Sequence, residues 1–95
     1  MELEVRLTDR ARADIEDISK YLQNNWSEQV KIDFLVRLND QFKLISKMPL
    51  MFRASAKRSG IRECVMQKHT LIYYRIVEER FVQIVSIQST RRGSF

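Results

Sequence analysis

Cysteine and histidine are almost absent from this sequence, which has one residue of each, Cys64 and His69. A lone cysteine cannot form a disulfide bond within its own chain, and one His with one Cys falls short of the clustered ligands of a zinc site. We therefore expect neither a disulfide framework nor a bound metal. Unpaired thiols are typical of reducing compartments, so the composition favours the cytoplasm.

Glycine and proline are also scarce, with two Gly, at positions 60 and 93, and one Pro. Glycines so far apart cannot build the loop that cradles phosphates in nucleotide-binding proteins, and no Ser/His/Asp pattern is visible. No cofactor is therefore predicted. Few Gly and Pro, with 44% hydrophobic residues, are typical of an ordered globular chain.

Long apolar runs are missing as well. No stretch approaches the roughly 20 apolar residues that a membrane-spanning helix needs. Glu2, Glu4 and Arg6 interrupt the N-terminus, so it does not read as a secretory signal peptide. We expect no membrane association.

The 95 residues predict a single domain over 1–95 that begins with a strand and a helix. Residues 2–7 alternate polar and apolar, which is typical of a half-buried strand, and their charged face indicates a sheet edge. Thr8 and Asp9 supply a helix N-cap. The helix should end at 24–25, and its apolar stripe is formed by Ala11, Ile15, Ile18 and Leu22.

A second helix is predicted from the cap Ser27 to Met48, because the residue before Pro49 avoids the helical region. The short connection between the helices predicts an antiparallel hairpin. Trp26 lies at the joint, where we expect it to anchor the core. The main apolar stripe of this helix is Phe34, Leu38, Phe42 and Ile45.

Three strands should complete the fold after an irregular loop at 49–59. The strands are expected at 61–67, 71–77 and 81–87, followed by a polar basic tail. Short turns between them indicate an antiparallel meander, which the first strand must join. The fold class predicted is α+β, with the order β-α-α-β-β-β and a helical hairpin packed on a mostly antiparallel four-stranded sheet.

Positive charge is concentrated in the second half of the chain. Residues 1–47 hold eight Lys/Arg and nine Asp/Glu, a net −1, whereas residues 48–95 hold nine and three, a net +6. Scattered surface charge is the simplest explanation, but four cations between 53 and 62 with no acid favour a binding patch for nucleic acid or an acidic protein segment. The candidate binding residues are Arg53, Lys57, Arg58, Arg62, Lys68, Arg75, Arg91 and Arg92.

The residues that most invite a catalytic role are better explained by structure. His69 has no partner visible in the sequence, and a turn residue bonded to local backbone is the favoured interpretation. Cys64, in an alternating strand, reads as a small core residue rather than a nucleophile. Tyr73 and Tyr74 should point to opposite faces of the sheet, with packing favoured for both over stacking on a base. No catalytic residue is assigned.

Several stretches resemble one known family. They are residues 16–22, 25–27 and 45–52, and above all GIREC at 60–64 and KHTLIYYRI at 68–76. Over nearly the whole chain they resemble the RelE/ParE superfamily of bacterial toxins, on its ParE side. The resemblance implies a type II toxin that is neutralised by a protein antitoxin wrapped around it, in a complex that can be a heterotetramer or larger.

The resemblance leaves three functions open. ParE-like members poison DNA gyrase, RelE-like members cut messenger RNA in the ribosome, and members without clear activity are also known. Ribonuclease members typically need a constellation of lysines and arginines, often with a tyrosine near the C-terminus. Here Arg91 and Arg92 are followed by no Tyr or His, and Phe95 cannot transfer a proton. This favours a gyrase inhibitor that is not an enzyme. The antitoxin segment is expected along a sheet edge or the helix surface, with its acids near Arg53, Lys57 and Arg62.

Overall fold

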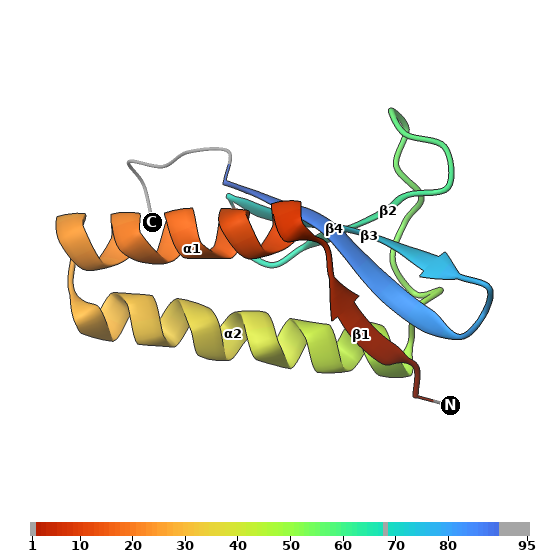
Figure 1. The fold of residues 1–95 in the computed structure, drawn as a ribbon, viewed down its shortest axis with the longest axis horizontal. Coiled ribbons are helices and arrows are strands. Elements are labelled where there is room, and N and C mark those ends of the chain that lie inside the picture. The colour runs from red at the N-terminus through yellow and green to blue at the C-terminus, as the bar shows by residue number, and fades with distance from the viewer. Residues whose placement is uncertain (1, 68, 90–95) are drawn as a thin grey trace.

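The fold joins two helices to one four-stranded sheet, in a computed structural model that describes residues 2–67 and 69–89 (Figure 1). The elements follow in the predicted order, and the α+β class is confirmed. Their bounds are β1 Glu4–Leu7, α1 Asp9–Asn25, α2 Glu28–Lys47, β2 Arg62–Val65, β3 Thr70–Val77 and β4 Phe81–Ser89.

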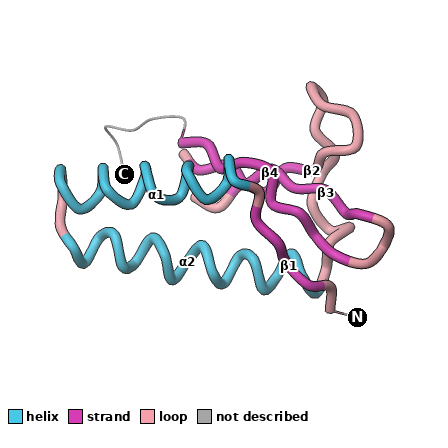
Figure 2. Tube along the Cα trace, viewed as in Figure 1, coloured by secondary structure: helices cyan, strands magenta, loops and turns pink. Residues whose placement is uncertain are grey.

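The strands lie in the order β1-β4-β3-β2. β2 pairs antiparallel with β3, and β3 with β4, whereas β1 pairs in parallel with β4. The first strand is therefore an edge strand, as its charged face predicted, and the sheet is mostly antiparallel. The helices lie side by side as a hairpin, and the loop between α2 and β2 projects from the end of the molecule far from the helix joint (Figures 1 and 2).

The helices cover one face of the sheet and close a single core around it. The predicted stripes are confirmed, with Ala11, Ile18 and Leu22 buried on α1 and Phe34, Leu38 and Ile45 on α2. Ile15 and Phe42 pack at the margin. From the sheet the core receives Cys64, Met66, Ile72, Tyr74, Val82, Ile84 and Ile87.

Trp26 does not anchor this core, and that prediction was wrong. It is 51% exposed, at the C-terminal cap of α1. Its backbone N–H donates to Leu22 O at 2.9 Å, so the residue ends the helix through its main chain. The side chain lies outside both helical stripes, and it therefore remains on the surface.

The strand bounds differ from the predicted ones because partners decide where a strand ends. β1 begins at Glu4, which pairs with Phe81, the first residue of β4, so residues 2 and 3 have no strand beside them. β2 is shorter than predicted, since Met66 N already donates to Thr70 O at 2.9 Å and closes the turn to β3. β4 runs two residues further, to Ser89, which pairs with Thr70.

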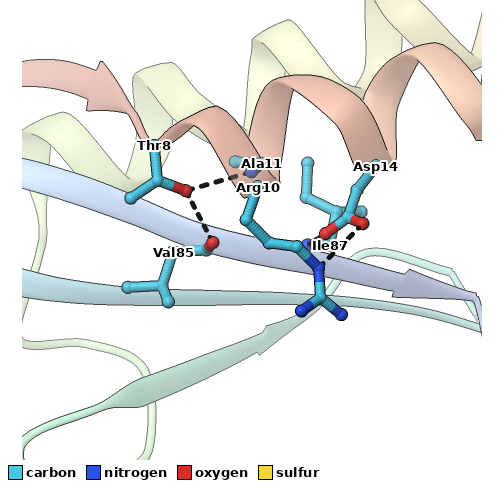
Figure 3. Close-up of polar contacts among 6 residues, drawn as sticks. All are labelled: Thr8, Arg10, Ala11, Asp14, Val85 and Ile87. Atoms are coloured by element: carbon cyan, nitrogen blue, oxygen red, sulfur yellow. Dashed lines mark hydrogen bonds and ion pairs between the residues drawn. The ribbon is translucent and has the colours of Figure 1, made fainter.

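The start of α1 is fastened to β4 by two side chains (Figure 3). Thr8 Oγ1 accepts from Ala11 N at 3.0 Å as the helix cap and donates to Val85 O at 2.7 Å. One turn on, Asp14 Oδ2 accepts from Ile87 N at 3.0 Å. β4 continues beyond the end of β1 here, so these side chains satisfy backbone groups that no strand reaches.

Candidate functional site

The loop between α2 and β2 is fixed to the sheet at its first half. Tyr74 on β3 donates its hydroxyl to Pro49 O at 2.6 Å, and Arg62 on β2 donates Nη1 to Phe52 O, also at 2.6 Å. The ring of Phe52 meets Tyr74 edge-to-face, with centroids 6.3 Å apart. The loop therefore has a defined path although its sequence has no period.

The second half of the loop pairs with the outer edge of β2. Glu63 N donates to Arg53 O at 3.0 Å, and Ser55 N donates to Ile61 O at 2.7 Å. Ser55 Oγ also accepts from the backbone N–H of Lys57 and Arg58, at 3.2 and 3.3 Å. These bonds give the second half of the loop a defined turn.

Two of these loop cations reach the sheet face that the helices leave open. Tyr74 is fully buried on the helix side, so its neighbour Tyr73 points to the other face. The Arg58 guanidinium lies over the Tyr73 ring, 5.4 Å from its centroid. Arg53 Nε lies 2.9 Å from Glu63 Oε1, and Glu63 pairs with Tyr73 across the two strands.

Two cations of the strands extend this surface across the sheet. Arg75, two residues from Tyr73 on the same face, donates Nε to Gln83 Oε1 at 2.7 Å. Arg6 on β1 lies over the Phe81 ring at 4.1 Å and contacts Glu4 at 2.6 Å. We call the set Arg6, Arg53, Arg58 and Arg75, with Tyr73 and Phe81, the cationic sheet face.

The predicted binding residues divide into three groups. Arg53, Arg58 and Arg75 lie on the cationic sheet face, and Lys57 is exposed in the loop beside it. Arg62 points to the opposite side, because it alternates with Glu63 and its guanidinium is half-buried against the loop backbone. Lys68, Arg91 and Arg92 lie outside the described residues.

Arg6 was missed by the sequence reasoning. The alternation of residues 2–7 placed it on the polar face of an edge strand, but not beside the last strand. Its neighbours follow from the parallel pairing of Arg6 with Gln83, which itself pairs with Arg75. That pairing joins the two ends of the chain, and no short-range pattern encodes it.

Uncompensated positive charge is the main electrostatic feature of this surface. Arg6 and Arg53 each have a carboxylate close by. Arg58, Arg75 and Lys57 have none within ion-pair distance among residues 2–67 and 69–89. Guanidinium groups held on aromatic rings are partly ordered in advance, so this face is suited to bind phosphates or carboxylates.

The titratable groups beneath the loop are unsuited to proton transfer near neutral pH. Burial raises the pKa of the Cys64 thiol, although a bond from Gln41 at 3.0 Å opposes the shift. Burial also raises the pKa of Tyr74 to about 12, against the opposing charge of Arg62. Both groups therefore stay protonated and act as structure, as predicted for Cys64. His69 lies half-buried in the turn before β3.

Neither a metal site nor a membrane span is found in the part of the chain that the structure describes. Within it, no three His, Cys, Asp or Glu side chains gather closely enough to ligate an ion. Neither α1 nor α2 has the length and apolar character required to cross a bilayer.

The sequence matches one protein family over nearly its whole length. The family described as the ParE toxin of the type II toxin–antitoxin system parDE matches residues 5–93. The chain belongs to the ParE toxin family. It is also 31% identical over 72 residues to Toxin ParE1 of Caulobacter vibrioides, covering 75% of this chain and 74% of that toxin. The resemblance to the ParE branch is confirmed.

Solved structures agree with the ParE fold. The chromosomal ParDE system of P. aeruginosa contains a chain that superposes with a TM-score of 0.81 at 17% identity, over 95% of this chain and 98% of that one. A chain of the RelBE2 toxin–antitoxin complex from Mycobacterium tuberculosis gives 0.60 at 19% identity, over 94% and 99%. At such identities the likeness concerns the fold, which ParE and RelE-like proteins share.

Proposed function

We propose that this ParE-family toxin arrests growth by binding and poisoning DNA gyrase in the cytoplasm, without catalysing a reaction itself. Family membership supports the toxin role. The observation that carries the target proposal is the cationic sheet face, which offers Arg58 and Arg75 without carboxylate partners in the described chain. Such a surface is suited to bind an anionic partner.

A supercoiling assay with purified gyrase tests this proposal. The chain should inhibit supercoiling and cause cleaved DNA–gyrase complexes to accumulate. Arg58→Glu should weaken inhibition about tenfold, since it reverses a charge that no local acid balances. Lys20→Glu is the control, because Lys20 lies on α1, paired with Glu16 at 3.1 Å. Unchanged supercoiling by a chain that still arrests growth would contradict gyrase as the target.

A ribosome-dependent endoribonuclease is the second candidate. It is favoured by the placement of Arg53, Arg58 and Arg75 around Tyr73 on an open sheet, since clustered cations can stabilise a phosphate transition state. This function predicts codon-phased transcript cleavage after induction. Cleavage should be lost on substitution of Lys57, Arg58 or Arg62. Intact transcripts during growth arrest would exclude it.

A protein antitoxin is the proposed partner. Two of the structural neighbours are described as a ParDE system and a RelBE2 complex. An adjacent reading frame that encodes a small protein would identify the candidate antitoxin, and co-expression of the two chains should then yield a stable complex, a heterotetramer or larger. If the chain alone leaves growth normal while the complex forms, it is a non-toxic antitoxin-binding module.

A further inference from the structure

The guanidinium groups of the cationic sheet face form a line across the sheet. Arg6 on β1 and Arg75 on β3 both pair with Gln83 of β4, one from each side. Two strand spacings separate them, which places their Cα atoms about 10 Å apart. Arg58 lies over Tyr73, which is two residues from Arg75 and thus about 7 Å farther along β3. The positive groups therefore cover an extended stretch of surface rather than converge on one point.

Unbalanced charge lies at one end of this line. Arg6 and Arg53 each contact a carboxylate, whereas Lys57, Arg58 and Arg75 have none within ion-pair distance among residues 2–67 and 69–89. All three of these unpaired cations are exposed. A bound anion would thus meet three positive charges that no acid of the described chain neutralises.

Both aromatic rings of this face already have a cation over them. Arg6 lies 4.1 Å from the centroid of the Phe81 ring, and Arg58 lies 5.4 Å from that of Tyr73. Each ring thus has a guanidinium where an unpaired base would stack, and such stacking is a main contact of single-stranded nucleic acid. The same guanidinium groups cover the rings as anchors for a protein partner. What the face offers is therefore mainly N–H donors with positive charge.

A duplex backbone suits an extended line of such donors. Duplex DNA carries one negative charge per about 1.7 Å of its axis, so phosphates are present along the whole length of the line. An acidic protein segment would instead need carboxylates at matching positions, with apolar contacts at the centre of the interface. The exposed Val65 lies outside the line, because it pairs with Leu71, beyond Tyr73 on the side away from Arg75. The arrangement therefore favours DNA over an acidic protein surface.

We propose that the cationic sheet face binds the phosphate backbone of duplex DNA, with Lys57, Arg58 and Arg75 as the principal contacts and without reading the base sequence. For its role in the cell the proposal rests on the gyrase inhibition proposed above, since the duplex concerned is the one that gyrase holds. The face then contacts the DNA of that complex rather than an acidic surface of the enzyme.

Fluorescence anisotropy with a short labelled duplex tests the DNA contact without gyrase. The full chain should bind with a Kd of about 10⁻⁴ to 10⁻⁶ M at physiological salt, the range of sequence-independent binding. The logarithm of the binding constant should fall linearly with that of the salt concentration. Arg58→Gln and Arg75→Gln should each make this slope shallower by about 0.9 and raise the Kd about threefold or more.

Lys43→Gln is the matched control, because it removes the same charge from the other side of the molecule. Lys43 is exposed on α2, in the layer that covers the opposite face of the sheet, and no carboxylate of the described chain lies within ion-pair distance of it. Its Kd and salt slope should match those of the wild type. If Arg58→Gln and Arg75→Gln change the slope no more than Lys43→Gln does, the proposal is overturned.

Two competitors identify the chemistry that the face prefers. Unlabelled duplex should displace the labelled duplex more effectively than either the single strand of the same sequence or polyglutamate, compared at equal concentration of charge. Stronger displacement by the single strand would show that bases stack on the face. Stronger displacement by polyglutamate would show that it prefers an acidic protein. Either result overturns the proposal.

The supercoiling assay separates this proposal from the proposed function. If the face contacts DNA, Arg58→Gln and Arg75→Gln should lose inhibition of gyrase in proportion to their lost affinity for the duplex. If they lose inhibition but bind the duplex as the wild type does, the face contacts gyrase itself, so this inference is overturned while gyrase remains the target. If the wild type binds the duplex through this face but does not inhibit supercoiling, the DNA site stands and gyrase is not the target.

Discussion

Tyr74 connects the core to the loop that carries the basic residues. Its ring is fully buried, and its hydroxyl holds Pro49 while Phe52 packs against its edge. Arg62 complements it by holding the next part of the loop. Arg62, predicted from the sequence to be a binding residue, thus positions the loop that carries other cations. Reversing the charge of Arg62 would disturb Arg53 and Arg58 indirectly.

The raised pKa of Tyr74 predicts a loss of stability in alkaline solution. Its pKa is raised from 10.0 to about 12, so the folded state retains the phenol proton where the unfolded state releases it. The stabilisation is complete below pH 10 and is lost as the pH rises from 10 to 12. Chemical unfolding across this window should show a smaller decrease in the free energy of unfolding for Tyr74→Phe than for the wild type.

Tyr73→Phe is the matched control for that measurement, because Tyr73 lies on the open face, and it should behave as the wild type does. At neutral pH, Tyr74→Phe should lower the free energy of unfolding by about 1 kcal/mol through the lost bond to Pro49 O. Identical alkaline profiles for wild type and Tyr74→Phe would show that another group causes the decrease.

Asp14 provides a second test at a single side chain. It is only 16% exposed and accepts the Ile87 N–H, which no strand can reach. Asp14→Ala should therefore lower the free energy of unfolding by about 1–3 kcal/mol in urea, because a backbone donor is left unpaired. Asp17→Ala, exposed on the same helix, should change it by less than about 0.5 kcal/mol. Equal effects of the two would contradict the role given to Asp14.

Among the elements, the turn between β3 and β4 is the one whose sequence conflicts with its conformation. Its central residues Glu78 and Glu79 both have positive φ, 52° and 57°, and Arg80 N donates to Val77 O at 2.9 Å. Both central residues of this turn thus have left-handed backbone, to which Asn and Gly are better suited than Glu. Left-handed backbone costs a residue with a Cβ about 1–2 kcal/mol.

Replacing both residues should stabilise the protein. Glu78→Asn with Glu79→Gly is expected to raise the free energy of unfolding by about 1 kcal/mol, or the Tm by about 4–8 °C. Glu78→Ala with Glu79→Ala removes the same charges but keeps both Cβ atoms, and it should give no such gain. If thermal melts show equal gains for the two pairs, charge repulsion rather than backbone strain is relieved.

The helices were predictable from sequence because their signals are local. Caps at Thr8 and Ser27 and the stop at Pro49 lie within a few residues of the boundaries they set. Strand boundaries depend on partners distant in the chain, so β1 and β2 are shorter than predicted. Trp26 shows the same limit, since hydrophobicity alone does not tell whether a side chain at a joint reaches the core.

For the whole molecule, charge counting located the basic half but not the direction of each side chain. Arg53, Arg58 and Arg75 meet on one face, whereas alternation along β2 turns Arg62 beneath the loop. Arg6 joins them through the parallel pairing of β1 and β4.

The loop cations of the cationic sheet face form one surface, and this predicts that they act together on the target. Arg53 contacts Glu63, and Arg58 lies over Tyr73, the residue that pairs with Glu63. Arg53→Glu with Arg58→Glu should therefore weaken target inhibition about tenfold or more in the supercoiling assay, whereas the control Lys20→Glu should leave it unchanged. Unchanged inhibition by the double variant would exclude this face as the target surface.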